Sequence, residues 1–354
     1  MGPCSKHHRG NVATAQAGAA DLETIRLSMH AELATDYFQL RGVDAQKELL
    51  ETNIVAYQKA LDLTNDRHNQ GIASGVDVEQ ARTQLETTRA QSADLGVQRT
   101  QLEHAIAVLT GKPPSELAIA PVPLKEQPPA IPVALPSELL ERRPDIASAE
   151  RHVAAANAQI GVTMAAFYPT ISLSAGGGLE SSVITTLIQW PSRFWSLGGS
   201  LLQTVFDAGK RRAVTDQAIA AYDVTVDAYR LSVLTAFQDV EDNLSALRVL
   251  SDEAKIQEAA VKSAERSLEL ANFRYKGGIT TYLEVITAQS VALTNERTAV
   301  DLLSRRMSAS VALVKALGGG WDASSLPSSV NLLAKQPSPL PPGQPTKVSE
   351  KPKP

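Results

Sequence analysis

One segment of this chain occurs twice. Residues 61–111 return as residues 268–318 at a constant offset of 207 positions (268 − 61), without a gap. Gly71 thereby matches Gly278, and Gly111 matches Gly318. Each copy shows a helical pattern, a short turn that contains glycine, and a second helical pattern. A duplicated helical hairpin predicts a pseudo-symmetric, mainly helical architecture with an internal two-fold repeat, and not an ordinary catalytic domain.

A long helix is predicted in front of each turn. Residues 13–67 and 209–275 contain no proline, and a run of more than 50 such residues gives a rod of roughly 75 Å at 1.5 Å per residue. In the second run, apolar residues from Val226 to Leu247 recur every three or four positions, which is typical of a coiled-coil seam. The returning helices are expected at about 76–110 and 283–317.

The segment between the two copies is predicted to contain the only strands. Residues 170–179 alternate between apolar and small polar side chains, and residues 196–205 do the same; a period of two indicates strands. Five aromatic residues stand at the ends of these strands: Phe167, Tyr168, Trp190, Phe194 and Trp195. Such a pair fits outer-membrane strands with an aromatic girdle, and it equally fits a soluble hairpin packed on the helices.

The expected segments are therefore 1–110 (first helical hairpin), 111–136 (proline-rich crossover), 137–166 (connecting helix), 167–208 (strand hairpin), 209–320 (second helical hairpin) and 321–354 (disordered, proline-rich tail). The chain carries a net charge of −4 and a single cysteine, so nothing points to nucleic acid and no intrachain disulfide can form. No catalytic constellation, metal-ligand spacing or cofactor motif stands out. An enzyme is not expected.

Five motifs carry a resemblance to a known family. They are residues 135–146 (LPSELLERRPDI), 154–161 (AAANAQIG), 166–173 (AFYPTISL), 206–212 (FDAGKRR) and 274–285 (RYKGGITTYLEV). Together they resemble the outer membrane efflux proteins, the TolC-like outer membrane factors, and within them the OprM/NodT-type lipoproteins of RND efflux systems. The resemblance extends from about residue 13 to residue 318.

The resemblance implies a homotrimer in the outer membrane of a Gram-negative bacterium. In that family each protomer gives four strands to a shared outer-membrane β-barrel and two helical hairpins to a periplasmic α-barrel. The trimer is a passive exit duct for small molecules. Its partners are a periplasmic adaptor (membrane fusion) protein, an inner-membrane RND pump and outer-membrane lipid. The alternative is a soluble coiled-coil interaction protein derived from a truncated channel gene.

One departure from the family pattern follows from the repeat. The family has a strand pair in each half, and the offset between the copies puts the end of the first pair near residue 1. The chain is therefore expected to be N-terminally truncated, without the first strand pair, the signal sequence and any lipidated cysteine.

The resemblance also assigns residues to the periplasmic tip. The two turns, which would contact the adaptor, contain Gly71, Ile72, Ser74, Gly278, Ile279 and Thr281. The pore constriction would contain Asp77, Tyr275 and Glu284, with three copies of Glu284 forming an acidic ring. Thr280 stands where TolC itself has a gate arginine. The ion pair by which that arginine closes the gate is therefore not expected in this chain.

The residues themselves allow a local explanation of the same positions. Gly71 and Gly278 permit a positive φ, and Ser74 and Thr281 are suited to cap the outgoing helices. The carboxylates of Asp77 and Glu284 lie in first turns, where they offset the helix dipole.

Overall fold

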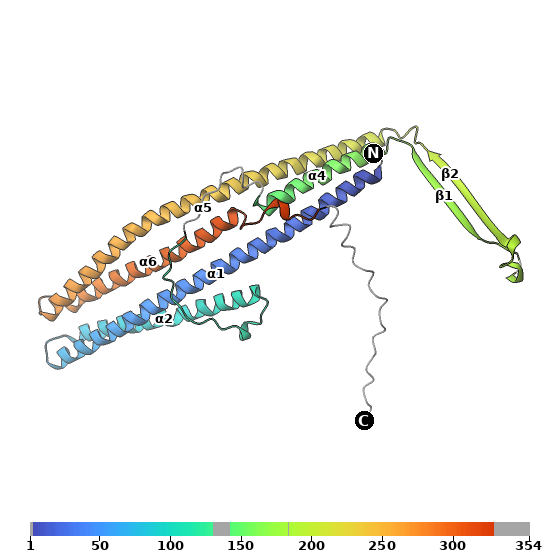
Figure 1. Cartoon of the computed structure of the whole chain (residues 1–354). Coiled ribbons are helices and arrows are strands. Elements are labelled where there is room, and N and C mark those ends of the chain that lie inside the picture. Colours follow the sequence, from blue (N-terminus) through green and yellow to red (C-terminus); the bar gives the residue numbers. More distant parts are fainter. Residues whose placement is uncertain (1–2, 130–141, 183, 329–354) are drawn as a thin grey trace, which may run out of the picture. The chain divides into compact units, whose positions relative to one another are not determined.

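A computed structural model describes residues 3–129, 142–182 and 184–328. The main elements in chain order are α1 (Pro3–Asn69), α2 (Gly75–Leu109), α4 (Pro144–Ala165), β1 (Thr170–Leu179), β2 (Arg193–Leu202), α5 (Lys210–Lys276) and α6 (Tyr282–Ala316). Figure 1 shows α1 turning back into α2 and α5 turning back into α6. Short 3-10 turns lie at Pro114–Glu116, Ile184–Thr186, Trp190–Ser192 and Ala323–Ser325.

The helical repeat predicted from the sequence is confirmed. Helices α1 and α5 each contain 67 residues, and α2 and α6 each contain 35. Both pairs keep the offset of 207 positions (210 − 3 and 282 − 75). Because corresponding helices of the two hairpins are equal in length, the two hairpins are built alike.

Glycine ends the helices at equivalent places in both copies. Gly71 and Gly278 have φ values of 75° and 72° at the turns, and Gly111 and Gly318 have 71° and 88° after the returning helices. Past the first turn, the N–H of Ile72 donates to the carbonyl of Arg67 at 2.8 Å, and the second turn repeats this bond at 3.0 Å. This is the pattern of a Schellman cap, which needs a residue with positive φ.

The described residues fall into two compact units. The unit with the helical turns comprises residues 22–144 and 233–323. Its core is a set of small clusters along the helices, because each helix is a thin rod that buries only one stripe. Leu40, Leu50, Leu85 and Leu313 are almost fully buried there. Helices α1 and α6 lie close together at Gly42, where a Cβ atom would overlap Ser304.

A buried cluster of charged side chains holds the crossover against α1 and α2. Asp44 of α1 accepts hydrogen bonds from Arg99 of α2 at 2.8 Å and from the backbone N–H of Val122 at 3.0 Å. Arg99 also donates to the carbonyl of Ile119 at 2.5 Å, and Arg41 donates to that of Ala120 at 2.6 Å. The crossover, after its 3-10 turn, is therefore held extended at least to residue 124 by charged side chains. Residues 130–136 of the predicted crossover lie outside the described part.

The other unit contains residues up to 21, residues 145–232 and residues from 324. Its two strands form one antiparallel hairpin in which Thr170 faces Leu202 and Leu179 faces Arg193. The predicted limits of β1 are those observed. The second strand was expected at 196–205 but lies at 193–202, because its ends are set by pairing with β1.

The hairpin has two chemically different faces. Residues directly opposite each other point to the same side, so Ile171 and Leu173 share a face with Leu197 and Leu201. The opposite face carries mostly hydroxyl side chains and glycines, among them Ser172 paired with Ser200, with Leu202 and Phe194 at its two ends. The isolated chain leaves both faces exposed.

Helix α4, the described part of the predicted connecting helix, begins at Pro144. Proline suits a first helical position because its missing N–H has no partner there anyway. Residues 137–141 and the predicted tail from 329 lie outside the described residues. Among the helices formed by the described residues, none is long and apolar enough to cross a membrane.

Candidate functional site at the helical turns

The ends of all four long helices pack together beside the two turns. One buried cluster joins side chains from the two hairpins; its members are Tyr57, Leu61, Val78, Ala81, Leu85, Ala271, Tyr275, Tyr282 and Val285. Five of these residues come from the first hairpin and four from the second. The two turns are thus tied into one structure.

Tyr282 is the best-buried large side chain of this cluster. It is 2% exposed, and its ring lies 5.2 Å from that of Tyr275, at 58°. Burial, together with the neighbouring Tyr275, Tyr57 and Asp77, raises the pKa of the Tyr282 phenol to about 12. The phenol is therefore neutral throughout the ordinary pH range.

Arg67 links the first turn to the second. Its guanidinium lies 4.7 Å from the centre of the Tyr275 ring and donates to the Tyr275 carbonyl at 2.9 Å. The resemblance assigns Tyr275 to the constriction, whereas in the sequence Arg67 is only the position that matches Arg274 at the offset of 207. That match was the available signal, but it could not show that the two arginines have different partners.

Arg274 pairs within its own hairpin. It contacts the Glu284 carboxylate at 2.7 Å, and the hydroxyl of Thr280 donates to the same carboxylate. Glu284 is therefore both a first-turn carboxylate and half of a partly exposed ion pair. The threonine in place of a gate arginine takes part in this local contact.

The two expected N-caps behave differently. Ser74 and Asp77 form a reciprocal capping box at α2: the N–H of Ser74 donates to the Asp77 carboxylate at 3.1 Å, and the N–H of Asp77 donates to the Ser74 hydroxyl at 3.2 Å. Thr281 occupies the N-cap position of α6, but its side chain makes no capping bond. The capping prediction is thus right for Ser74 and wrong for Thr281, because the backbone N–H of Glu284 donates to the Thr281 carbonyl at 3.3 Å and not to its hydroxyl.

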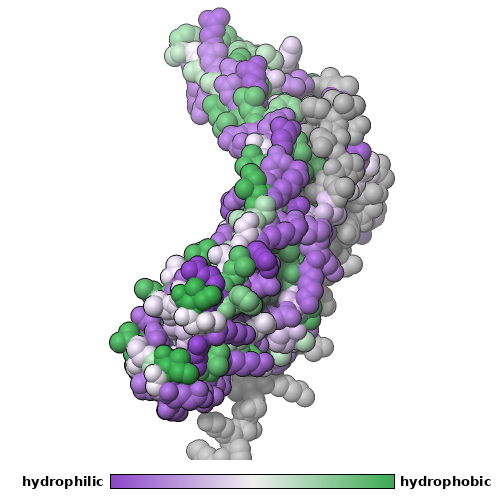
Figure 2. Space-filling view, turned by 90° about the vertical axis from the view of Figure 1, so that its left-hand side faces the viewer, coloured by the Kyte–Doolittle hydropathy of each residue, from purple (hydrophilic) through white to green (hydrophobic). Residues whose placement is uncertain are grey.

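The outer surface of the turns is partly apolar. Ile72 is 64% exposed and Ile279, its counterpart in the repeat, is 68% exposed. Figure 2, viewed from the side on which the turns lie in Figure 1, shows hydrophobic residues among hydrophilic ones there. Exposed isoleucines at equivalent positions of both turns mark this end as a candidate contact surface.

The five aromatic residues singled out in the sequence lie at opposite ends of the strand hairpin. Phe167 and Tyr168 precede β1, and Trp190, Phe194 and Trp195 lie at the start of β2. All five are exposed. Arg211 lies 5.3 Å from the Phe167 ring and Arg193 lies 4.2 Å from the Trp190 ring, so each end of the hairpin combines aromatic and basic groups.

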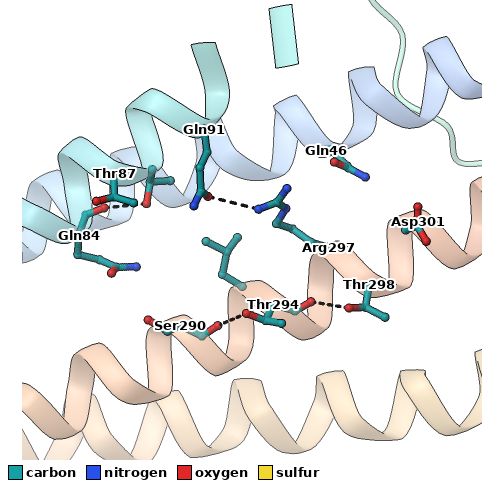
Figure 3. Close-up of a pocket in the computed structure, with 11 residues that line it drawn as sticks. Gln46, Gln84, Thr87, Gln91, Ser290, Thr294, Arg297, Thr298 and Asp301 are labelled. Carbon is teal, nitrogen blue, oxygen red and sulfur yellow. Dashed lines mark hydrogen bonds between the residues drawn. The ribbon is translucent and has the colours of Figure 1, made fainter. Parts of the chain in front are cut away.

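A polar cavity of about 570 Å³ lies farther along the helices, between α2 and α6 (Figure 3). Arg297 of α6 donates to the Gln91 side chain of α2 at 3.3 Å. The hydroxyls of Thr294 and Thr298 donate to carbonyls of their own helix at 2.7 and 2.9 Å. The Thr88 hydroxyl also donates to a carbonyl of its own helix, so most threonine hydroxyls of this cavity are already engaged and it offers a ligand few free donors.

The first prediction concerns the backbone of the second turn. Substitution Gly278→Ala should lower the free energy of unfolding by about 1–2 kcal/mol, since an alanine at φ of 72° is strained although nothing crowds its Cβ. The neighbouring Gly277→Ala is the control, because its φ is not positive and its Cβ contacts are ordinary. Chemical denaturation of both variants measures the difference; equal stabilities would contradict the assigned strain.

The second prediction concerns Tyr282. In a spectroscopic pH titration, this phenol should ionise near pH 12 and not near its ordinary value of 10.0. Above pH 10 the unfolded chain releases a proton that the folded chain retains, so stability should fall as the pH rises from about 10 to about 12. In Tyr282→Phe the last ionising component should vanish and the fall should be shallower. An unchanged titration curve in this variant would rule out the assignment.

The fold is therefore that of a duplicated helical-hairpin protein, with an extended crossover and one amphipathic strand pair between the two copies. The family pattern of outer membrane efflux proteins matches residues 5–112 and 135–319, and the chain belongs to this family. It is a family of transport proteins and not of enzymes.

Individual relatives agree with this assignment. The chain is 32% identical over 317 residues to the pyoverdine export outer membrane protein OpmQ of Pseudomonas aeruginosa, covering 89% of this chain and 66% of that protein. It is 34% identical over 307 residues to the toluene efflux pump outer membrane protein TtgF of Pseudomonas putida, covering 86% and 64%. The chain thus spans slightly less than two thirds of the length of these curated relatives.

Solved structures show the same fold. The outer-membrane channel OprN superposes with a TM-score of 0.85 at 30% identity, covering 91% of this chain and 73% of that one. CusC superposes with a TM-score of 0.84 at 27% identity, covering 90% and 74%. In both comparisons the likeness covers at least nine tenths of this chain.

Proposed function

We propose that this chain is the outer-membrane exit duct of a tripartite, RND-type efflux system. The observation that carries the proposal is its likeness, over 91% of the chain, to a solved outer-membrane channel. As a homotrimer it would conduct small molecules passively, with an inner-membrane pump as the energy source and a periplasmic adaptor as the connector. In this assignment it resides in the outer membrane with its helices in the periplasm.

The strand hairpin supports the membrane part of the proposal. Ten-residue strands are about 33 Å long, which suits strands that cross a membrane at a tilt. The face with Ile171, Leu173, Leu197 and Leu201 suits lipid, and the face with serines suits water. The aromatic residues at both ends suit the two membrane interfaces.

The turns support the periplasmic part. Ile72 and Ile279 offer the adaptor an apolar contact at both tips. Asp77, Tyr275 and Glu284 lie at the same end of the hairpins, where the proposal puts the constriction. Arg67 joins the two turns through Tyr275, and Arg274 pairs with Glu284 within the second hairpin.

Recording of single channels formed by the full chain in planar lipid bilayers tests the function. Cation-preferring currents, together with a cross-linked trimer in detergent, are expected. A chain that remains monomeric, needs no detergent and gives no currents would instead support the alternative of a soluble coiled-coil interaction protein.

The pore assignment predicts that substitutions of Glu284 and Arg274 change the cation preference in opposite directions. Glu284→Gln should lower the preference for cations, because each protomer loses a negative charge from the constriction. Arg274→Gln should raise it, since Arg274 offsets Glu284 at 2.7 Å. Glu258→Gln is the control, because Glu258 is an exposed residue of α5 that pairs with Lys262. Equal ion selectivity in all four proteins would exclude the acidic ring.

A further inference from the structure

A pocket with basic walls lies in the unit that carries the strands. It has a volume of about 590 Å³ and is formed by the beginning of α1 and by α4, which lie side by side in Figure 1. Its polar wall residues are Lys6, His8, Arg9, Gln16, Arg151 and Asn157. Among the described residues that line it there is no carboxylate.

Small residues let the two helices approach closely enough to form this pocket. A Cβ atom on Gly10 of α1 would lie 3.5 Å from the Cβ of Ala158 on α4. A Cβ atom on Gly161 of α4 would overlap the side chain of Lys6, so Lys6 lies directly along the α4 backbone. The close approach brings cationic side chains from two helices into one cavity.

Arg151 is held in place but keeps binding capacity. One terminal nitrogen contacts Glu150 at 2.5 Å, and the other donates to the Gln16 side chain at 3.4 Å. Its Nε is buried and has no hydrogen-bond partner among the described residues. A buried N–H in this state is unfavourable, and an oxyanion in the pocket would satisfy it.

We propose that this pocket binds a phosphate group, either on a phospholipid head group or on a soluble phosphate compound. Lysine and arginine are the side chains that recognise phosphate oxygens, and a phosphate offers several oxygens to donors that converge from two helices. Among the described residues, Arg151 pairs with one carboxylate, that of Glu150, which does not line the pocket. The cavity is larger than a phosphate ion and leaves room for the organic group attached to it. This proposal does not depend on the proposed duct function.

The experiment uses the full chain in detergent and follows inorganic phosphate by ³¹P NMR titration. Saturable binding is expected, and Arg151→Gln should weaken it about tenfold, as the loss of one charge-assisted hydrogen bond does. Lys6→Gln should weaken it as well. Arg230→Gln is the matched control, because Arg230 is an exposed arginine that pairs with Asp227 on α5. Circular dichroism checks that each variant keeps its helices.

A short-chain lipid identifies the source of the phosphate group, and acetate tests the selectivity for phosphate. Displacement of phosphate by dihexanoyl phosphatidylglycerol supports a lipid head group, and binding of phosphate without such displacement supports a soluble phosphate. Acetate at equal ionic strength should not compete. The proposal is overturned by the absence of saturable binding of both phosphate and lipid, by equal affinity in Arg151→Gln and the unsubstituted chain, or by equal binding of acetate.

Discussion

Substitution Asp44→Ala should destabilise the protein by about 3–5 kcal/mol, because it removes one member of a buried ion cluster and leaves its partners uncompensated. The Asp44 side chain is only 2% exposed, and Arg41 and Arg99, at 11% and 14%, both contact it. The N–H of Val122 would lose its acceptor at the same time. Chemical denaturation measures the loss of stability, and hydrogen exchange should show faster exchange at Val122.

Glu48→Ala provides the matched control. Glu48 lies on the same helix, one turn away, and also pairs with the crossover, through Lys125 at 3.8 Å. The side chains of Glu48 and Lys125 are both exposed, at 56% and 74%, so the loss of stability should be about 0–1 kcal/mol. Similar losses in the two variants would show that the Asp44 cluster does not hold the crossover.

Substitution Gly42→Ala should lower the free energy of unfolding by about 1–3 kcal/mol through overpacking. The new Cβ would overlap Ser304 Oγ and lie 3.1 Å from Ser304 Cβ. Alanine is a better helix former than glycine by about 1 kcal/mol, so the steric effect must exceed this gain. Thermal or chemical denaturation measures the net result.

Two further variants separate the steric effect from the helix propensity. Gly42→Ala combined with Ser304→Gly should regain most of the lost stability, because both crowded atoms are removed. Gly18→Ala, at an open position of the same helix, should be stabilising by about 1 kcal/mol. A stable Gly42→Ala single variant would mean that α1 and α6 pack less closely at this point.

The local parts of the fold could be predicted from the sequence. The strand at residues 170–179 was found within its observed limits because alternation of side chains is a property of neighbouring residues. The glycine turns at Gly71 and Gly278 were found for the same reason, since a positive φ is a local requirement. The second strand was placed three residues too late because its ends depend on the partner strand.

The candidate site was predictable only in part. Tyr275 and Glu284 were singled out through the resemblance, and Ser74 through its capping position. Arg67 was missed as a contact of Tyr275, because the two residues are 208 positions apart and Arg67 and Arg274 look equivalent in the sequence. The capping role predicted for the Thr281 hydroxyl is wrong, because the N–H of Glu284 donates to the Thr281 carbonyl instead.

The sequence by itself determined the repeat, the helical hairpins, the strand pair and the family. These follow from periodicity, turn residues and motifs, which act over short stretches of chain. Only the tertiary structure decided that Asp44, Arg99 and Val122 share one buried cluster, and that Lys6 and Arg151 share one pocket. The physical reason is that such contacts depend on how closely two helices approach each other. That distance is set by small residues on separate elements, such as Gly42 and Gly161.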